Sequence, residues 1–141
     1  MSDYDPNYIP KKTYFLVSQK AIILNQKNDI LLLKRSNKVE SGGEWNLPGG
    51  GLEENEKPLD SIKREIVEEV GIEVADIKPY GSYSFKNNDD NLIVIYYKSQ
   101  ISSADIKLNW EHDDFRWVTR DEALSMEITE VTRFFFENYE V

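Results

Sequence analysis

Cysteine is absent from the 141 residues of this sequence, and histidine occurs once, as His112. The lack of cysteine excludes disulfide bonds, zinc sites with thiolate ligands and a cysteine nucleophile. A single histidine also excludes a metal centre built from several histidines, or the two-histidine helix of a zinc protease. We leave His112 itself out of the candidate site, because a lone histidine more often makes local hydrogen bonds than performs catalysis.

The sequence has fewer positively charged than negatively charged residues. The chain has 17 Lys and Arg residues against 26 Asp and Glu residues, which gives a formal net charge of −9 at pH 7. This balance argues against a long nucleic acid or an anionic membrane surface as the partner. A small phosphorylated ligand remains compatible with it, because divalent metal ions can supply the missing positive charge.

Long apolar runs and a signal peptide are also missing. The longest apolar runs, Ala21–Leu24, Ile30–Leu33 and Leu92–Tyr97, have the length of strands and are too short to span a membrane. Residues 1–12 are polar and contain two prolines, so they lack the apolar core of a signal peptide. We therefore expect a cytoplasmic protein without a membrane segment, in which residues 1–12 form a loose N-terminal segment.

What is present indicates one globular α+β domain over residues 1–141. Hydrophobic residues make up 40% and aromatic residues 12% of the chain, which is typical of a folded core. The periodicity predicts a helix from Lys57 to Val70, stopped by Gly71, and a second helical region near the C-terminus. The predicted strands are Thr13–Val17, Ala21–Leu24, Ile30–Lys34, Leu92–Gln100 and Phe115–Val118, and residues Ile72–Phe85 are predicted to be extended. The second helical region comprises Arg120–Leu124 and Thr129–Tyr139.

The helix from Lys57 to Val70 carries an apolar stripe beside an acidic face. At about 100° per residue, four apolar side chains fall within roughly 80° of one another: Leu59, Ile62, Ile66 and Val70. Three carboxylates occupy the neighbouring face within roughly 100°: Glu65, Glu68 and Glu69. Like charges at this spacing repel one another, and such a cluster is what Mg²⁺ or Mn²⁺ needs.

Just before this helix lies the densest glycine cluster of the chain, Pro48-Gly49-Gly50-Gly51. Without side chains in the way, its backbone can approach an ion or a phosphate closely. Each feature has an ordinary alternative, because the glutamates could form a solvated face and the glycines a flexible turn. Their combination favours a site.

The spacing of the two features is specific. Gly50 is followed after five residues by Glu56, and after seven more by Arg64-Glu65-Ile66-Val67-Glu68-Glu69-Val70-Gly71-Ile72. This stretch resembles the Nudix box without a mismatch. The segment Trp45–Gly50 and the late stretch Glu111–Val118 are also similar to the corresponding parts of that family. Asn55 departs from the glycine that many relatives have there, but asparagine tolerates the left-handed backbone that the turn requires.

The resemblance implies a Nudix-type α/β/α sandwich with a mixed β-sheet. It also implies an enzyme that uses Mg²⁺ or Mn²⁺ to hydrolyse the phosphoric anhydride bond of a nucleoside diphosphate linked to another moiety. By similarity, Glu65, Glu68 and Glu69 would be the metal-binding carboxylates, and the Gly49 carbonyl would be a further ligand. Such ions neutralise the diphosphate and lower the pKa of a bound water.

Arg64 would orient the carboxylates by pairing with Glu68, or with Glu56 as the alternative. The general base that accepts the proton of the water stays open. Within the box, Glu68 or Glu69 could serve. Outside it, Glu111 is the best candidate, because family members often place a base or an extra ligand in that region. An ordinary loop carboxylate is the alternative for Glu111.

The substrate is narrowed by elimination. Relatives specialised for ADP-ribose or dinucleoside polyphosphates often carry a proline or tyrosine shortly after the box, and residues 87–90 hold neither. This favours a small-molecule substrate, a modified or ordinary nucleoside triphosphate, split into a monophosphate and pyrophosphate. The alternatives are an ADP-ribose, nucleotide-sugar or dinucleotide pyrophosphatase, or a non-catalytic nucleotide-sensing domain. A homodimer stays open.

Overall fold

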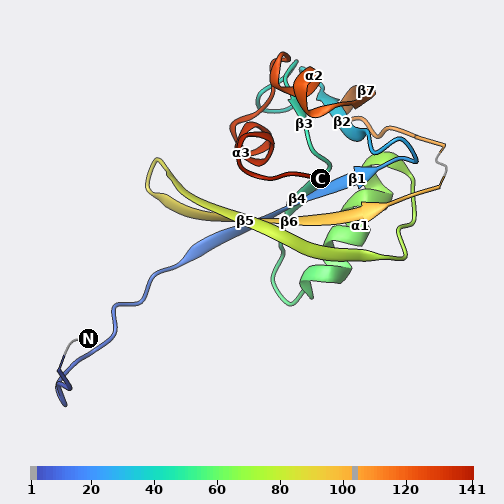
Figure 1. Ribbon diagram of the computed structural model, residues 1–141. Coiled ribbons are helices and arrows are strands. Elements are labelled where there is room, and N and C mark those ends of the chain that lie inside the picture. Colours follow the sequence, from blue (N-terminus) through green and yellow to red (C-terminus); the bar gives the residue numbers. More distant parts are fainter. Residues whose placement is uncertain (1–2, 103–104) are drawn as a thin grey trace.

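The computed structural model describes residues 3–102 and 105–141 (Figure 1). Their strands form a mixed sheet with the order β3-β2-β1-β6-β5, in which β4 also pairs with β1, and β7 with β2. The elements in chain order are β1 (Phe15–Leu24), β2 (Ile30–Arg35), β3 (Trp45–Asn46), β4 (Gly49–Gly51), α1 (Pro58–Val70), β5 (Ile77–Asn87), β6 (Asp90–Gln100), β7 (His112–Val118), α2 (Arg120–Leu124) and α3 (Glu130–Asn138).

The sheet opens between β1 and β2, and this opening positions the site. The two strands pair only at Leu24 and Ile30, next to their connecting turn. Farther along, β4 pairs with β1 through residues 49–51, and β3 pairs with β2 through residues 45–46. The segment from Trp45 to Gly51 therefore runs between the separated strands. On its other edge, β1 pairs in parallel with β6 over its whole length.

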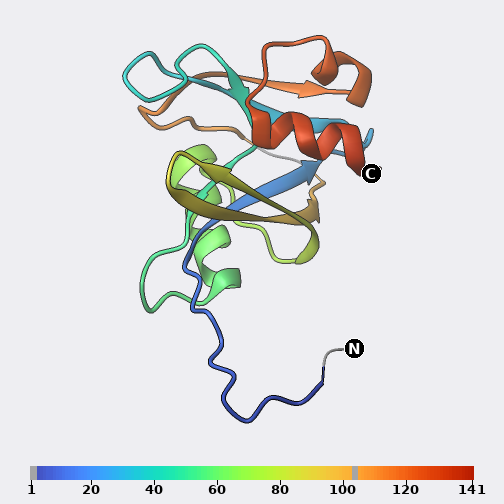
Figure 2. The ribbon, with the colours of Figure 1, turned by 90° about the vertical axis from the view of Figure 1, so that its left-hand side faces the viewer.

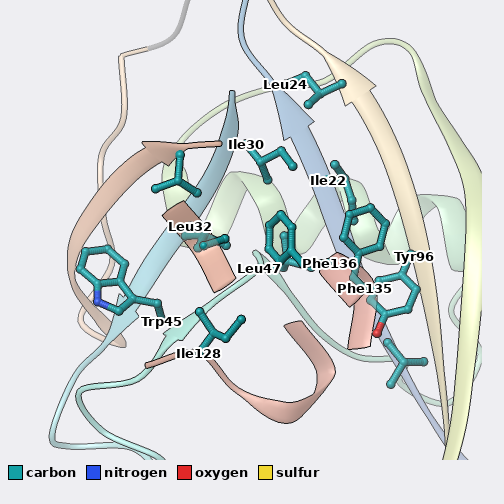
Figure 3. Close-up of a cluster of buried hydrophobic side chains, with 13 residues drawn as sticks. Ile22, Leu24, Ile30, Leu32, Trp45, Leu47, Tyr96, Ile128, Phe135 and Phe136 are labelled. Carbon is teal, nitrogen blue, oxygen red and sulfur yellow. The ribbon is translucent and has the colours of Figure 1, made fainter. Parts of the chain in front are cut away.

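The two faces of the sheet bury separate cores, because successive strand residues point to opposite faces. One core packs α1 against the sheet through residues that include Ala21, Ile23, Leu31, Leu33, Ile62, Ile66 and Val70. The other packs α3 against the opposite face; Figure 3 shows its members Ile22, Leu32, Trp45, Leu47, Tyr96, Phe135 and Phe136. Figure 2 shows α3 and α1 on either side of the sheet, which is the predicted α/β/α arrangement.

The helix that carries the box is confirmed at both ends. Lys57 is its N-cap, Pro58 opens its first turn, and Gly71 ends it in the left-handed conformation with φ of 71°. Asn55 also adopts the left-handed conformation, with φ of 65°. One detail was wrong: Leu59 is 44% exposed. Leu59 has almost the same angular position as Ile66, seven residues on, so its exposure reflects its place at the end of the helix.

The first two predicted strands form one continuous strand. β1 runs through the polar residues Ser18, Gln19 and Lys20, which pair with the glycines of β4 on one side and with β6 on the other. The stretch predicted as extended from Ile72 becomes a strand only at Ile77.

Residues 3–14 lead away from the sheet in Figure 1, and all of them are exposed. In the described part of the chain, none of the helices has both the length and the apolar character needed to cross a membrane.

Candidate active site

Two of the three glycines of β4 lie very close to neighbouring atoms. Gly49 has φ of 143°, and a Cβ atom there would lie 1.9 Å from the backbone oxygen of Gln19 on β1. A Cβ atom at Gly50 would lie 2.7 Å from the carboxylate of Glu65. Real Cβ atoms do not come this close to other heavy atoms. At Gly49 the close atoms belong to the main chain, so only glycine fits there, whereas a side chain at Gly50 would push away the flexible end of Glu65.

The three box glutamates differ in burial because they differ in angle on α1. Glu69 lies seven residues after Ile62 and therefore shares its angular position within about 20°, on the buried face. Glu65 lies at the flank, and Glu68 lies farthest from the core. Their side chains are accordingly 4%, 16% and 53% exposed, in the order Glu69, Glu65, Glu68. The exposure of the three carboxylates therefore increases step by step from the core toward solvent.

Arg64 gathers the carboxylates on the solvent side. Its Nε and Nη2 donate to both oxygens of Glu56, at 2.9 and 3.0 Å. Its Nη1 donates to both oxygens of Glu68 at 3.1 Å, and Nη2 lies 3.3 Å from Glu65 Oε1. Both proposed partners of Arg64 are thus found, together with a third. These bonds hold the pKa of Glu56 below its ordinary value and raise that of Arg64.

Glu69 is enclosed on the inner side. Its Oε1 accepts a hydrogen bond from the backbone N–H of Gly49 at 3.0 Å, and its Oε2 lies 3.5 Å from Nε2 of the buried His112. Burial raises the pKa of Glu69 to about 8, although the nearby Lys20 ammonium and the Gly49 N–H oppose this shift. Burial likewise raises the pKa of Glu65 and lowers that of Lys20. The positive groups near Glu69 and Glu65 therefore do not offset the cost of burying these two carboxylates.

Glu111 lies in the turn just before β7, and Asn109 holds it there. The Asn109 side chain donates from Nδ2 to Glu111 Oε1 at 3.2 Å and accepts from the Glu111 backbone N–H at 3.3 Å. The charge of Glu111 acts on Lys20, Glu65 and Glu69, which places this carboxylate in the same electrostatic environment as the box.

A divalent cation fits this donor set chemically. The side chains of the cluster offer oxygen atoms, which hard cations prefer, and the raised pKa of Glu69 reflects a deficit that a cation would fill. Among residues 3–102 and 105–141, no three acidic or histidine side chains converge on one point as they stand. Arg64 contributes to this by holding both oxygens of Glu68. For three carboxylates to share an ion, Glu68 must give up part of this contact.

Three neighbours of the cluster were not expected from the sequence. Lys20 is buried on β1, where it stands opposite Gly49 in the strand pairing. His112, which we left out, contacts Glu69, and Asn109 links His112 with Glu111. One signal was available for Lys20, because a polar triplet interrupts an otherwise apolar strand at residues 18–20. Nothing in the sequence marks Asn109.

Comparisons with known proteins identify the family of this chain. The model of the NUDIX domain matches residues 15–139. The nucleoside triphosphatase NudI of Enterobacter sp. (strain 638) is 31% identical over 127 residues, which cover 82% of this chain and 89% of that protein. The 8-oxo-dGTP diphosphatase of Proteus vulgaris is 42% identical over 53 residues, or 38% of this chain. The crystal structure of a MutT protein from Methanosarcina mazei Go1 has a TM-score of 0.77 and 31% identity, covering 91% of this chain and 94% of that one. This chain belongs to the Nudix hydrolase family.

Proposed function

We propose that this protein is a Mg²⁺- or Mn²⁺-dependent pyrophosphohydrolase that splits a nucleoside triphosphate, ordinary or modified, into a nucleoside monophosphate and pyrophosphate. The observation that carries the proposal is the graded cluster of Glu65, Glu68 and Glu69 on α1, which Arg64 gathers on one side and Gly49 on the other. The similarity to proteins named as a nucleoside triphosphatase and an 8-oxo-dGTP diphosphatase supports this substrate class.

The ion would be held by the three glutamates and the Gly49 carbonyl. Once bound, it would neutralise the diphosphate and lower the pKa of a water molecule toward neutrality. The protein contributes the remaining functions. Arg64 keeps Glu68 and Glu65 near one another despite their like charge, and the Gly49 N–H fixes one oxygen of Glu69.

Proton transfer from the attacking water is assigned to Glu111. This carboxylate stands outside the box, so its lone pairs are not committed to the same ion as the three box glutamates. One of its oxygens is held by Asn109, which orients the carboxylate without protonating it. Lys20 lies buried on the same side of the cluster, where burial lowers the pKa of its ammonium group and the carboxylate of Glu69 opposes that shift.

The test is a panel of substrates with Mg²⁺, Mn²⁺ or EDTA: the eight common nucleoside triphosphates, 8-oxo-dGTP, ADP-ribose and a dinucleoside polyphosphate. Products are separated chromatographically, and pyrophosphate is distinguished from phosphate. Glu68→Gln is the informative variant. Glu54→Gln, which changes an exposed glutamate of the preceding loop, is the matched control.

We expect metal-dependent release of pyrophosphate from a triphosphate, its loss in Glu68→Gln and its retention in Glu54→Gln. Turnover of ADP-ribose or the dinucleotide alone would overturn the proposed substrate class. Tight nucleotide binding without turnover of any substrate would instead indicate the sensing function, and turnover in EDTA would refute the metal dependence.

A further inference from the structure

The first residues of β1 have an edge that no other strand of residues 3–102 and 105–141 covers. On one side, β1 pairs with β6 from Phe15 onward. On the other side, its pairing with β4 begins only at Ser18, and the Leu52 N–H donates to the Val17 carbonyl oxygen at 2.8 Å. Backbone groups of successive strand residues point to alternate edges, so those of Phe15 point, like those of Val17, to the uncovered edge. Unpaired backbone groups on a strand edge are a template for pairing with another chain.

The segment that carries this edge is apolar and exposed. Tyr14, Phe15 and Leu16 are 80%, 48% and 57% exposed, and Tyr8 farther out is exposed as well. Single exposed apolar residues are normal on a folded protein, whereas four large ones within nine residues indicate an interaction surface. Figure 1 shows residues 3–14 leading away from the rest of the chain, so a partner can reach both the edge and these side chains.

A second copy of the same segment fits this edge in an antiparallel register. Under two-fold symmetry, each contact between two residues occurs twice. The register that brings the apolar side chains of the two copies together has Tyr14 facing Tyr14, so that Phe15 faces Thr13 and Leu16 faces Lys12. The backbone groups of Phe15 and Thr13 then meet on the shared edge. The two tyrosines form a cross-strand aromatic pair, which stabilises antiparallel strands.

The charges beside this register are complementary. The register places the exposed Lys11 of one copy alongside Val17 of the other, where the Leu52 N–H occupies the edge. The two residues that follow Leu52 are the exposed Glu53 and Glu54. Within one copy, Lys11 lies six residues before Val17, which is about 20 Å along an extended chain. The contact between these lysines and carboxylates therefore requires a second copy.

We propose that residues 12–16 pair antiparallel with the same residues of a second copy, so that the protein is a two-fold symmetric homodimer whose sheets are joined through β1. Lys11 and Lys12 of each copy contact Glu53 and Glu54 of the other. The proposal concerns the partner of the chain and not the reaction, so it holds or fails independently of the proposed function. The competing explanations are a segment that stays unpaired and a segment that binds a different protein.

Charge reversal tests the contact between the two copies. One double variant, Lys11→Glu with Lys12→Glu, places carboxylates against the two glutamates of the other copy. The second, Glu53→Lys with Glu54→Lys, places lysines against the two lysines. Like charges that face one another oppose association, so each double variant should dimerise at least about 10-fold more weakly than wild type in sedimentation equilibrium. An equimolar mixture of the two variants restores opposite charges at both contacts and should form a mixed dimer with the affinity of wild type.

The matched control is Lys27→Glu with Lys38→Glu, which makes the same change of net charge as the first double variant at two exposed lysines elsewhere. It should dimerise like wild type. A wild-type protein that is monomeric at every concentration would overturn the proposal in favour of an unpaired segment or a different partner. Dimers that resist both charge reversals, an equal weakening in the control, or a mixture that stays monomeric would overturn this interface. Failure of the protein to hydrolyse any nucleotide would count against the proposed function alone, because sedimentation needs no turnover.

A single introduced cysteine tests the register, because the chain contains none of its own. Tyr14→Cys places thiols on two facing residues, whose Cα atoms are about 4.5–5.5 Å apart in an antiparallel ladder and within reach of a disulfide. Thr13→Cys is the matched control, because its two copies are offset by two residues and lie about 8–9 Å apart. On mild oxidation, Tyr14→Cys should form the disulfide-linked dimer at least about 10-fold faster than Thr13→Cys. Equal rates, or a faster reaction of Thr13→Cys, would refute the register.

Discussion

Replacing Glu69 by glutamine should stabilise the metal-free protein at alkaline pH while abolishing its response to Mn²⁺. The change keeps the shape of the side chain and the acceptor for the Gly49 N–H, but it removes the capacity for charge. In the wild-type protein, burial raises the pKa of this carboxyl from 4.5 to about 8. Between these values the folded protein binds a proton that the unfolded chain has lost, so the free energy of unfolding falls as the pH rises.

The magnitude follows from that gap. A pKa of about 8 in the folded state against 4.5 in the unfolded state corresponds to about 5 kcal/mol of stability lost by pH 8.5, as an upper bound. Relaxation around the ionised carboxylate and the nearby Lys20 reduce this, and we expect about 1–3 kcal/mol to be observed. Glu69→Gln should lack the loss altogether. His112, whose pKa is lowered by burial to about 4, contributes in the opposite sense but only between about pH 4 and 6.5.

The assay is urea denaturation in EDTA at pH 6.5 and 8.5. The variant should already be more stable than wild type at pH 6.5, because the unfolded wild-type chain has lost the Glu69 proton there, and its advantage should be larger at pH 8.5, where the folded protein also ionises. Mn²⁺ should then restore the wild-type protein at pH 8.5 by mass action and leave the variant unchanged, because a ligand carboxylate must be ionised. A variant no more stable than wild type at pH 8.5 would refute the reasoning, since it would show that the buried charge is already compensated.

Three further predictions concern the neighbours of Glu69. Gly50→Ala should weaken the affinity for Mn²⁺ at least about 10-fold, because its Cβ would displace the Glu65 carboxylate. Gly51→Ala should leave the affinity unchanged, because the nearest atom to its Cβ would be 4.0 Å away. Equal affinities in the two variants would contradict the packing of the loop. Arg64→Lys should lower kcat about 10-fold or more with a small change in melting temperature, since a lysine cannot make the paired contacts of the guanidinium to two carboxylates; an unchanged kcat would show that these pairs serve stability alone. Glu111→Gln should lower kcat by about 10²- to 10⁴-fold yet keep the Mn²⁺-induced rise in melting temperature. If that rise disappears with the rate, Glu111 is a metal ligand instead.

Much of the fold could be predicted from local patterns. The box helix has strong signals at both ends, a proline at its start and a glycine in the left-handed conformation at its end, and its apolar spacing identifies the face that meets the sheet. The glutamates follow from the same spacing. Glu69 shares the predicted acidic face with Glu68, yet its angle relative to Ile62 already implies that it is buried.

The inner side of the site could not be predicted, because it depends on strand pairing. Lys20 reaches the cluster only because β4 pairs with β1 at that point, and Gly49 is its partner. His112 and Asn109 reach Glu69 because the turn before β7 folds back onto α1, some 40 residues away in the chain. The spacing of apolar residues within a short stretch of sequence cannot reveal contacts between residues so far apart in the chain. The polar residues 18–20 in an apolar strand were the one local sign of them.

The parallel pairing of β1 with β6 has a consequence for how the site comes into being. Phe15 pairs with Asn91, so the chain must close a long excursion that contains β2, the glycine strand and the whole of α1 before this part of the sheet exists. Closing such a loop lowers the entropy of the chain before any stabilising contact forms, so sheets with parallel pairing between distant strands form slowly. During synthesis, α1 emerges before β6 and the turn before β7, so its glutamates are then still exposed to water. The pKa of Glu69 rises only when β1, β4 and the turn before β7 have assembled around it and buried it. Metal affinity should therefore appear late in refolding, in step with β-sheet formation.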